Sequence, residues 1–157
     1  MLQRTDAILK RLCSQTTVVD ESILVDTGPI VAALVMGDEH HTWSAGIWRN
    51  LEPPLFTCEA VLSEAQFVVE RLGGNSLAVL EFIGRGILKI DFCATQEIER
   101  LLQLQTTYHN LPMSFADACL VRMAERHSHS RVFTTDSDFR IYRRNGRQII
   151  PLLAPPA

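Results

Sequence analysis

The feature that most constrains this chain is the alternation of short, continuously apolar segments with longer amphipathic ones. The short segments lack the every-second-residue pattern of half-exposed strands, so they are typical of strands buried on both faces of a parallel sheet. The longer segments repeat apolar residues at helical spacing. The alternation therefore predicts an α/β domain of three layers, with helices on both faces of a mainly parallel sheet.

The expected elements follow from this pattern. The strands are expected at residues 22–26, 53–57, 87–92, 131–136 and 147–153. The helices are expected at residues 28–36, 40–51, 59–73, 76–84, 95–109, 114–128 and 138–146. A chain of 157 residues has room for one such domain, expected at residues 22–157. Residues 1–21 are expected to form a helical extension, with Ile8, Leu9 and Leu12 on one face.

Composition excludes several classes of protein. No apolar run approaches the ~18 residues of a membrane span, and no secretory signal precedes the first helix. The four cysteines are widely spaced, which favours reduced thiols in a cytoplasmic protein and argues against a structural zinc site. The adjacent His40 and His41 are expected to cap or pack the second helix.

Acidic residues follow two of the expected strands. Asp26 ends the stretch ILVD, and Asp136 ends VFTTD, with Asp138 two residues later. In open α/β sheets, ligands bind beyond the carboxyl ends of the strands, so these side chains are candidates for a functional site. Taken singly, each is equally compatible with an aspartate of a turn or a helix N-cap.

Two further acids lie close to apolar helix faces. Glu64 is on the margin of the expected stripe Val61, Ala65, Val68, Leu72, and Asp117 precedes Leu120 and Val121 by three and four residues. A buried carboxylate is costly unless it is paired or metal-bound. Asp117 has a structural alternative, because SFAD is close to a capping box with Ser114 as N-cap. An arginine partner, Arg71 or Arg122, is the corresponding alternative for Glu64.

Together these acids suggest one site. Clustered carboxylates repel one another and would take up protons unless a cation were present. Mg²⁺ or Mn²⁺ suits a site made only of oxygen ligands. The set Asp26, Glu64, Asp117 and Asp136 is therefore predicted to hold one or two such ions, which activate water and stabilise the charge of a phosphodiester under attack.

Positive charge is concentrated near the C-terminus. The chain has a net charge of −3, but residues 120–150 contain seven arginines and three acids. This part of the chain is compatible with a local phosphate-binding face, and equally with a solvated arginine-rich helix.

At this point the sequence resembles the PIN domain family, most closely the VapC-type ribonuclease toxins. The resemblance covers residues 22–152 and rests on four blocks in the family's order and spacing. These blocks are ILVDTGPIVAAL, VLSEA, SFADACLVRMAE, and VFTTDSDF followed by YRRNGRQIIPLL. The N-terminal segment 1–21 is a departure from most compact members.

The resemblance implies a Rossmann-like fold with a five-stranded parallel sheet, cleavage of single-stranded RNA with Mg²⁺ or Mn²⁺, homodimers and, for toxins, a small antitoxin protein. It assigns the metal to Asp26, Glu64, Asp117 and Asp136, with Asp138 as an additional acid. A hydroxyl residue often precedes the last aspartate, here Thr134 or Thr135. Thr134 or Asp138 is then expected to orient a metal-bound water. The arginines expected to follow the RNA backbone are Arg140, Arg143, Arg144 and Arg147.

The same residues bear on other possible functions. A housekeeping RNA-processing nuclease and a non-catalytic binding module on this fold both remain open. A phosphoacceptor receiver domain needs a lysine at the end of its last strand, and this chain has only Lys10 and Lys89. A phosphatase of the D-x-D-x-T type is disfavoured because Phe139 and Arg140 follow Asp138.

Overall fold

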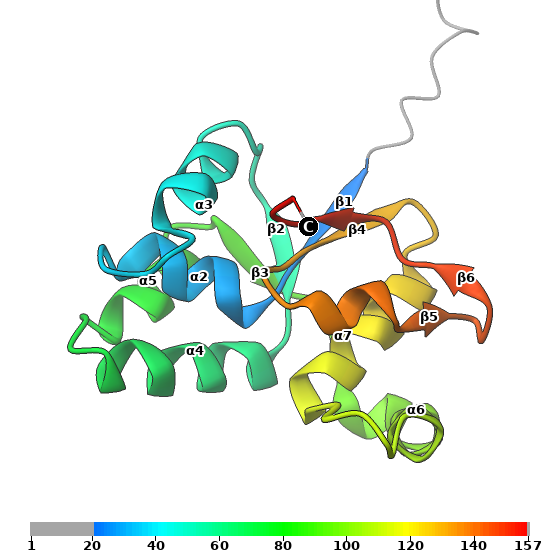
Figure 1. The fold of residues 1–157 in the computed structure, drawn as a ribbon. Coiled ribbons are helices and arrows are strands. Elements are labelled where there is room, and N and C mark those ends of the chain that lie inside the picture. Colours follow the sequence, from blue (N-terminus) through cyan, green and yellow to red (C-terminus); the bar gives the residue numbers. More distant parts are fainter. Residues whose placement is uncertain (1–20, 157) are drawn as a thin grey trace, which may run out of the picture.

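The computed structural model of the protein describes residues 21–156 (Figure 1). The helix expected in residues 1–21 lies outside this range except for Glu21. No helix within the described residues is long and apolar enough to cross a membrane.

The central sheet has five strands, all parallel to their neighbours. They are β1 (Ser22–Val25), β2 (Leu55–Thr57), β3 (Leu88–Ile90), β4 (Ser130–Phe133) and β7 (Leu152–Leu153). Their spatial order is β3-β2-β1-β4-β7, so β1 lies in the middle and pairs Leu24 with both Phe56 and Val132. The predicted parallel sheet is therefore confirmed. The point where the order reverses lies between β1 and β4, where such sheets place their ligands.

Helices cover both faces of this sheet. The connections before β3 form one layer, with α2 (Thr27–Leu34), α3 (His41–Trp48), α4 (Glu59–Arg71) and α5 (Leu77–Gly84). The connection from β3 to β4 forms the other layer, with a 3₁₀ turn (Ala94–Glu97), α6 (Ile98–Thr107) and α7 (Phe115–Arg126). Figure 1 shows the first layer on the left of the sheet and the second on the right. This arrangement confirms the three-layer architecture.

The core is built from the central strands and the helices that pack on them. Leu24, Val25, Val132 and Phe133 are fully buried, as expected for strands covered on both faces. Trp43 and Trp48 of α3 pack against the ring of Phe133, with ring centroids 5.6 and 5.4 Å apart. This rigid centre supports the loops at the carboxyl ends of β1 and β4.

The apolar face of α4 differs from the predicted stripe. Val61, Leu62, Ala65 and Val69 are its buried residues. Leu72 is 55% exposed because the helix ends at Arg71 and the chain turns away through Gly73 at a positive φ. In the C-terminal half of α4 the predicted stripe was therefore wrong by one residue, because Val69 is buried where Val68 was expected.

The segment after Asp136 is where the expected elements were wrong. Residues 138–146 do not form a helix. A 3₁₀ turn (Ser137–Arg140) is followed by β5 (Arg143–Arg144), which pairs antiparallel with β6 (Gln148–Ile149). Asn145 and Gly146 between them have φ angles of 51° and 78°, the left-handed conformation that an Asn-Gly turn adopts readily.

The expected strands at the end of the chain are also shorter than predicted. The segment 147–153 is divided at Pro151 into β6, which joins the hairpin, and β7, which joins the main sheet. Pro151 has no N–H to donate, but its carbonyl oxygen accepts a hydrogen bond from Val132 N at 2.9 Å. The fourth strand ends at Phe133, so Asp136 lies three residues beyond the sheet.

Candidate metal-binding site

Asp26 lies at the centre of the candidate site, directly after β1 and at the N-cap of α2. Its side chain is only 5% exposed. Oδ1 accepts a hydrogen bond of 2.7 Å from the backbone N–H of Thr27, and Oδ2 accepts one of 2.6 Å from the Thr134 hydroxyl. Both carboxylate oxygens are therefore held in place by the protein.

Thr134 connects Asp26 to the second strand-end acid. Thr134 is fully buried one residue after β4, and its hydroxyl oxygen accepts a hydrogen bond of 2.9 Å from the backbone N–H of Asp136. Oδ1 of Asp136 in turn accepts one of 2.8 Å from the backbone N–H of Asp138. The hydroxyl thus fixes Asp136 relative to Asp26, although the two residues come from different strands.

Close packing of the backbone supports the same arrangement. A Cβ atom built on Gly28 would lie 1.9 Å from Oγ1 of Thr135, far inside van der Waals contact. Only glycine lets the first turn of α2 approach the loop after β4 so closely. The position of Gly28 therefore brings the two strand ends together.

Asp117 reaches the site from the first turn of α7. Its backbone N–H donates to the Ser114 hydroxyl at 3.0 Å, and its Oδ2 accepts from the Ser114 backbone N–H at 2.8 Å. This is the capping box that the sequence offered as a structural alternative. Asp117 is nevertheless buried, with 8% of its surface exposed, and its Oδ2 also lies 3.5 Å from the hydroxyl of the buried Tyr142. Asp117 therefore both caps α7 and belongs to the acidic cluster.

Glu64 lies at the exposed rim of the cluster. Its Oε2 accepts a hydrogen bond of 3.2 Å from the Thr27 hydroxyl, which links α4 to the residue after Asp26. Neither suggested arginine is paired with it in the described structure. Arg71 lies over the Phe67 ring at 5.5 Å, and Arg122 forms ion pairs with Glu97 and Glu125.

The pKa values reflect the proximity of these acids. The pKa of Asp26 is raised from 3.8 to about 7, mainly by burial and to a smaller extent by the charges of Asp117 and Asp136, against the hydrogen bonds from Thr134 and Thr27. Burial likewise raises the pKa of Asp117, opposed by the hydrogen bonds from Ser114 and assisted by the charges of Asp136 and Glu64. Asp26 and Asp136 thus lie within electrostatic reach of each other and of Asp117, and Glu64 lies within reach of Asp117.

The donor set fits a hard divalent cation in its chemistry. It consists of carboxylate oxygens, and a cation would offset both the burial and the repulsion that raise the two pKa values. Within residues 21–156, no three His, Cys, Asp or Glu side chains converge on one point as the structure stands. Mg²⁺ in proteins usually keeps several water ligands, so it needs direct contact with only one or two carboxylates.

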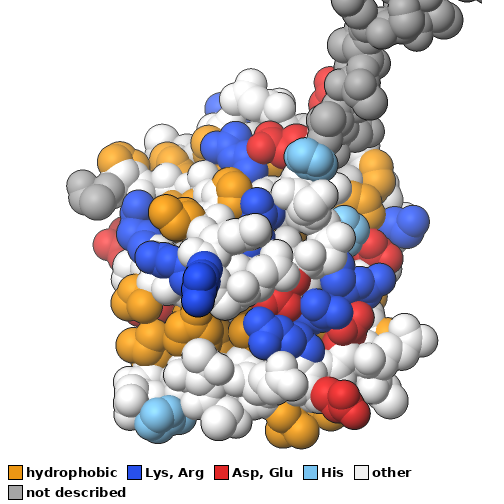
Figure 2. All heavy atoms as spheres, turned by 90° about the vertical axis from the view of Figure 1, so that its right-hand side faces the viewer, with side chains coloured by type: hydrophobic (Ala, Val, Ile, Leu, Met, Phe, Trp, Pro, Cys, Tyr) orange, Lys and Arg blue, Asp and Glu red, His pale blue; other side chains and the backbone are white. Residues whose placement is uncertain are grey.

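The four arginines singled out from the sequence lie on the segment that follows Asp136. Arg143 Nη1 donates to the carbonyl oxygens of Arg140, Ile141 and Tyr142 at 2.8 to 2.9 Å. Arg144 donates to the carbonyl oxygen of Ser128, and Arg147 is exposed at the hairpin. Figure 2 shows Lys and Arg side chains gathered on the face that carries this hairpin.

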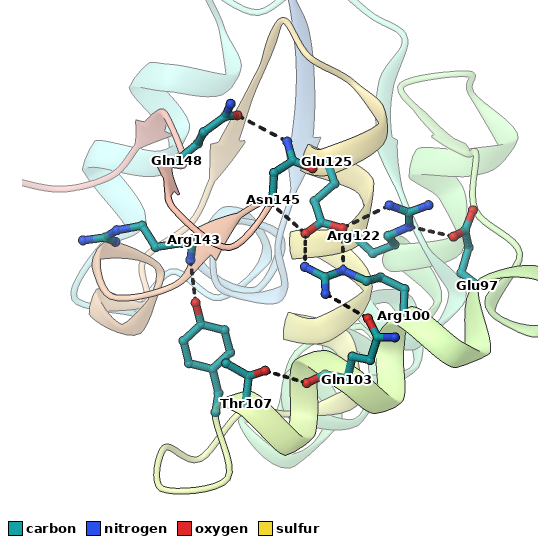
Figure 3. Close-up of polar contacts among 10 residues, drawn as sticks. Glu97, Arg100, Gln103, Thr107, Arg122, Glu125, Arg143, Asn145 and Gln148 are labelled. Atoms are coloured by element: carbon teal, nitrogen blue, oxygen red, sulfur yellow. Dashed lines mark hydrogen bonds and ion pairs between the residues drawn. The ribbon is translucent and has the colours of Figure 1, made fainter.

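Sequence reasoning missed the residues that anchor this hairpin, foremost Glu125 of α7. Its side chain is 1% exposed and accepts hydrogen bonds from Arg100 at 2.6 and 3.0 Å, from Arg122 at 3.0 Å and from the backbone N–H of Asn145 at 2.9 Å (Figure 3). The Tyr108 hydroxyl accepts a further bond from Arg143 N at 2.9 Å. The Asn-Gly pair was the signal that could have revealed the hairpin.

Comparisons with known proteins agree with this fold. A search of curated protein sequences found no match. Among solved structures, VapC20 of Mycobacterium tuberculosis, described as a sarcin-ricin loop cleaving toxin, superposes with a TM-score of 0.71 at 20% sequence identity. The match covers 83% of this chain and all of VapC20. The sequence profile of the PIN domain matches residues 23–145, and the chain therefore belongs to the PIN domain family.

Proposed function

We propose that this protein is an endoribonuclease that hydrolyses RNA phosphodiester bonds with Mg²⁺ or Mn²⁺. The observation that carries the proposal is the buried Asp26, held by Thr134 within electrostatic reach of Asp117 and Asp136 at the carboxyl ends of β1 and β4. Membership of the PIN domain family supports a nuclease activity on this fold. Fold alone does not determine function, so the acids carry the argument.

Asp26, Asp117 and Asp136 would hold the cation directly or through water, with Glu64 as an outer ligand at the exposed rim. When bound, the cation supplies Lewis acidity and lowers the pKa of water. The hydroxyl proton of Thr134 points to Asp26, which makes orienting that carboxylate its proposed role. Asp138, whose backbone N–H donates to Asp136, is the acid that we propose accepts a proton from the attacking water.

The arginines would bind the phosphates of the substrate. Arg140, Arg143, Arg144 and Arg147 follow the acidic site along the chain, and no acid lies between Arg140 and Arg147. Arginine forms paired hydrogen bonds with phosphate oxygens. The buried Glu125 and the Tyr108 hydroxyl hold the hairpin that carries Arg143, Arg144 and Arg147, so these three charges are presented from a fixed support.

The likeness to VapC20 favours a toxin as the biological role, opposed by a small antitoxin protein. A cytoplasmic location and a homodimer belong to the same proposal. Growth arrest on expression of this chain alone, relieved by a co-expressed partner encoded beside it, supports the toxin. A housekeeping nuclease would cleave RNA without arresting growth, and a binding module would do neither.

Cleavage of single-stranded RNA by the wild type and by Asp26→Asn tests the activity. We expect cleavage that requires Mg²⁺ or Mn²⁺, is abolished by EDTA and falls at least 100-fold in Asp26→Asn. Glu52→Gln, which changes an exposed acid in the loop before β2, is the matched control and should retain full activity. Equal cleavage by Asp26→Asn and the wild type would contradict the proposed site.

A further inference from the structure

A pocket of about 280 Å³ lies next to the acidic cluster, and its role is not explained by the acids themselves. It is formed where the loop after β4, the start of α3 and the end of the described chain meet. Its walls include His40, Asp136, Ser137, Arg140, Pro155 and Pro156.

Asp136 belongs both to this pocket and to the candidate metal site. A linear polymer whose phosphodiester bond lies at the acids must continue to either side of them. Because Asp136 lines the pocket, the pocket is placed beside the bond to be cleaved, where the adjoining residue of the polymer must lie.

Arg140 gives the pocket a positive charge that is not committed to a carboxylate. Within residues 21–156 it forms no ion pair, although Asp136 and Asp138 are close in sequence. Its side chain makes one hydrogen bond in this range, from Nη2 to the carbonyl oxygen of Pro155 at 2.9 Å. The remaining N–H donors of the guanidinium are free to bind an anion.

The other walls offer flat, mainly apolar surfaces. The His40 ring packs edge-on against Trp43, with centroids 6.4 Å apart and planes at 74°, and has no side-chain hydrogen bond that caps α3. Pro155 and Pro156 add two aliphatic rings. Unstacked bases of single-stranded RNA commonly stack on aromatic rings, including that of histidine.

We propose that this pocket binds the nucleotide adjacent to the scissile phosphate, with its phosphate on Arg140 and its base against His40 and the two prolines. This inference rests on the proposed function and adds to it a determinant of sequence preference. A nucleotide is favoured over a peptide of a partner protein because the pocket is small, shares Asp136 with the acids and contains a guanidinium that is not ion-paired within residues 21–156.

Binding can be tested without metal or cleavage. The ring resonances of His40 are followed by NMR while each of the four nucleoside 5′-monophosphates is added in the presence of EDTA. We expect saturable chemical-shift changes from which the affinity of each nucleotide is obtained. The affinity should depend on the base and should be at least tenfold weaker in Arg140→Ala. Arg85→Ala, which removes an exposed arginine paired with Glu81 on α5, should leave binding unchanged. No shift, or an equal effect of inorganic phosphate alone, would overturn the proposal.

Sequence preference gives the second measurement. RNA with a randomised segment is cleaved and the new ends are sequenced. We expect the wild type to prefer one base at a position next to the cut, and His40→Ala to lose that preference. His129→Ala changes an exposed histidine elsewhere on the surface and should keep it. If His40→Ala cleaves RNA with unchanged preference, the proposed nucleotide pocket is wrong and the nuclease activity is still supported. If nucleotides bind at His40 but the protein cleaves no RNA, the nuclease activity is wrong and nucleotide binding in the pocket is still supported.

Discussion

The Thr134 hydroxyl donates a 2.6 Å hydrogen bond to Oδ2 of Asp26 across 108 residues of sequence. This bond lowers the pKa of Asp26 and so opposes the effect of burial. Thr134→Val should raise that pKa further, because the valine offers no donor to the carboxylate.

We expect Thr134→Val to cleave RNA about tenfold more slowly at pH 7 and to reach its maximum rate at higher pH than the wild type. Thr134→Ser keeps the hydroxyl and should follow the wild-type pH–rate profile. A uniform loss at every pH would show instead that the hydroxyl acts only by positioning.

The second prediction concerns the stability of the metal-free protein. The native pKa of Asp26, about 7, is above its ordinary 3.8, so unfolding releases its proton between these pH values. Through this window Asp26 lowers the free energy of unfolding by about 1.4 kcal/mol for each pH unit of increase. At pH 8 in EDTA, Asp26→Asn should therefore be more stable than the wild type, by about 2–4 kcal/mol.

Urea unfolding from pH 4 to 8 measures this difference. The pKa of Asp117 is raised as well, so a smaller decrease of stability with pH should persist in Asp26→Asn. Mg²⁺ should stabilise the wild type by binding only the folded state, and should have much less effect on the variant. A variant less stable than the wild type at pH 8 would contradict the raised pKa of Asp26 in the folded protein.

Gly28 provides a prediction about backbone packing. In Gly28→Ala the new methyl group would collide with Oγ1 of Thr135. We expect a loss of about 1–3 kcal/mol in stability and a marked fall in activity, because the loop that carries Asp136 must shift. Adding Thr135→Ala removes the oxygen and should recover part of both losses. Gly37→Ala, where a Cβ atom meets nothing within 4 Å, is the control.

Glu125 should contribute to stability far more than a surface acid does. Glu125→Gln removes the charge of the buried carboxylate that the half-buried Arg100 and Arg122 guanidiniums share. We expect a loss of about 3 kcal/mol in chemical denaturation. Glu81→Gln breaks an exposed pair with Arg85 and should cost less than about 1 kcal/mol. Similar losses in the two variants would show that the Glu125 network contributes little.

The sheet and the strand-end acids could be predicted from the sequence because both depend on local signals. Continuous apolar runs specify buried strands, and Asp26 follows one of them directly. The hairpin was missed because Gly146 was interpreted as the C-terminal glycine of a helix at residues 138–146, whereas Asn145 and Gly146 form the turn of a hairpin. Tyr142 is in fact buried against Phe139 and Tyr108 as part of the tertiary core.

Contacts over long distances in sequence were beyond prediction for a different reason. Glu125 was not singled out in the sequence, because its partner Arg100 comes from another helix, 25 residues away. Thr134 and Thr135 were equivalent in the sequence, and only the fold directs one hydroxyl to Asp26 and brings the other against Gly28. Such pairings depend on how the layers pack, which no local pattern specifies.

Helix α7 has a mechanical consequence for the proposed enzyme. It carries Asp117 in its first turn and Glu125, the anchor of the arginine hairpin, eight residues later. Eight residues of α-helix span about 12 Å, so α7 sets the distance between the acidic cluster and Glu125, which holds the β5–β6 hairpin. Inserting or deleting one residue of α7 between Asp117 and Glu125 would rotate these two side chains relative to each other by about 100° about the helix axis. The length of α7 is therefore expected to tolerate change less than the length of any surface loop around it.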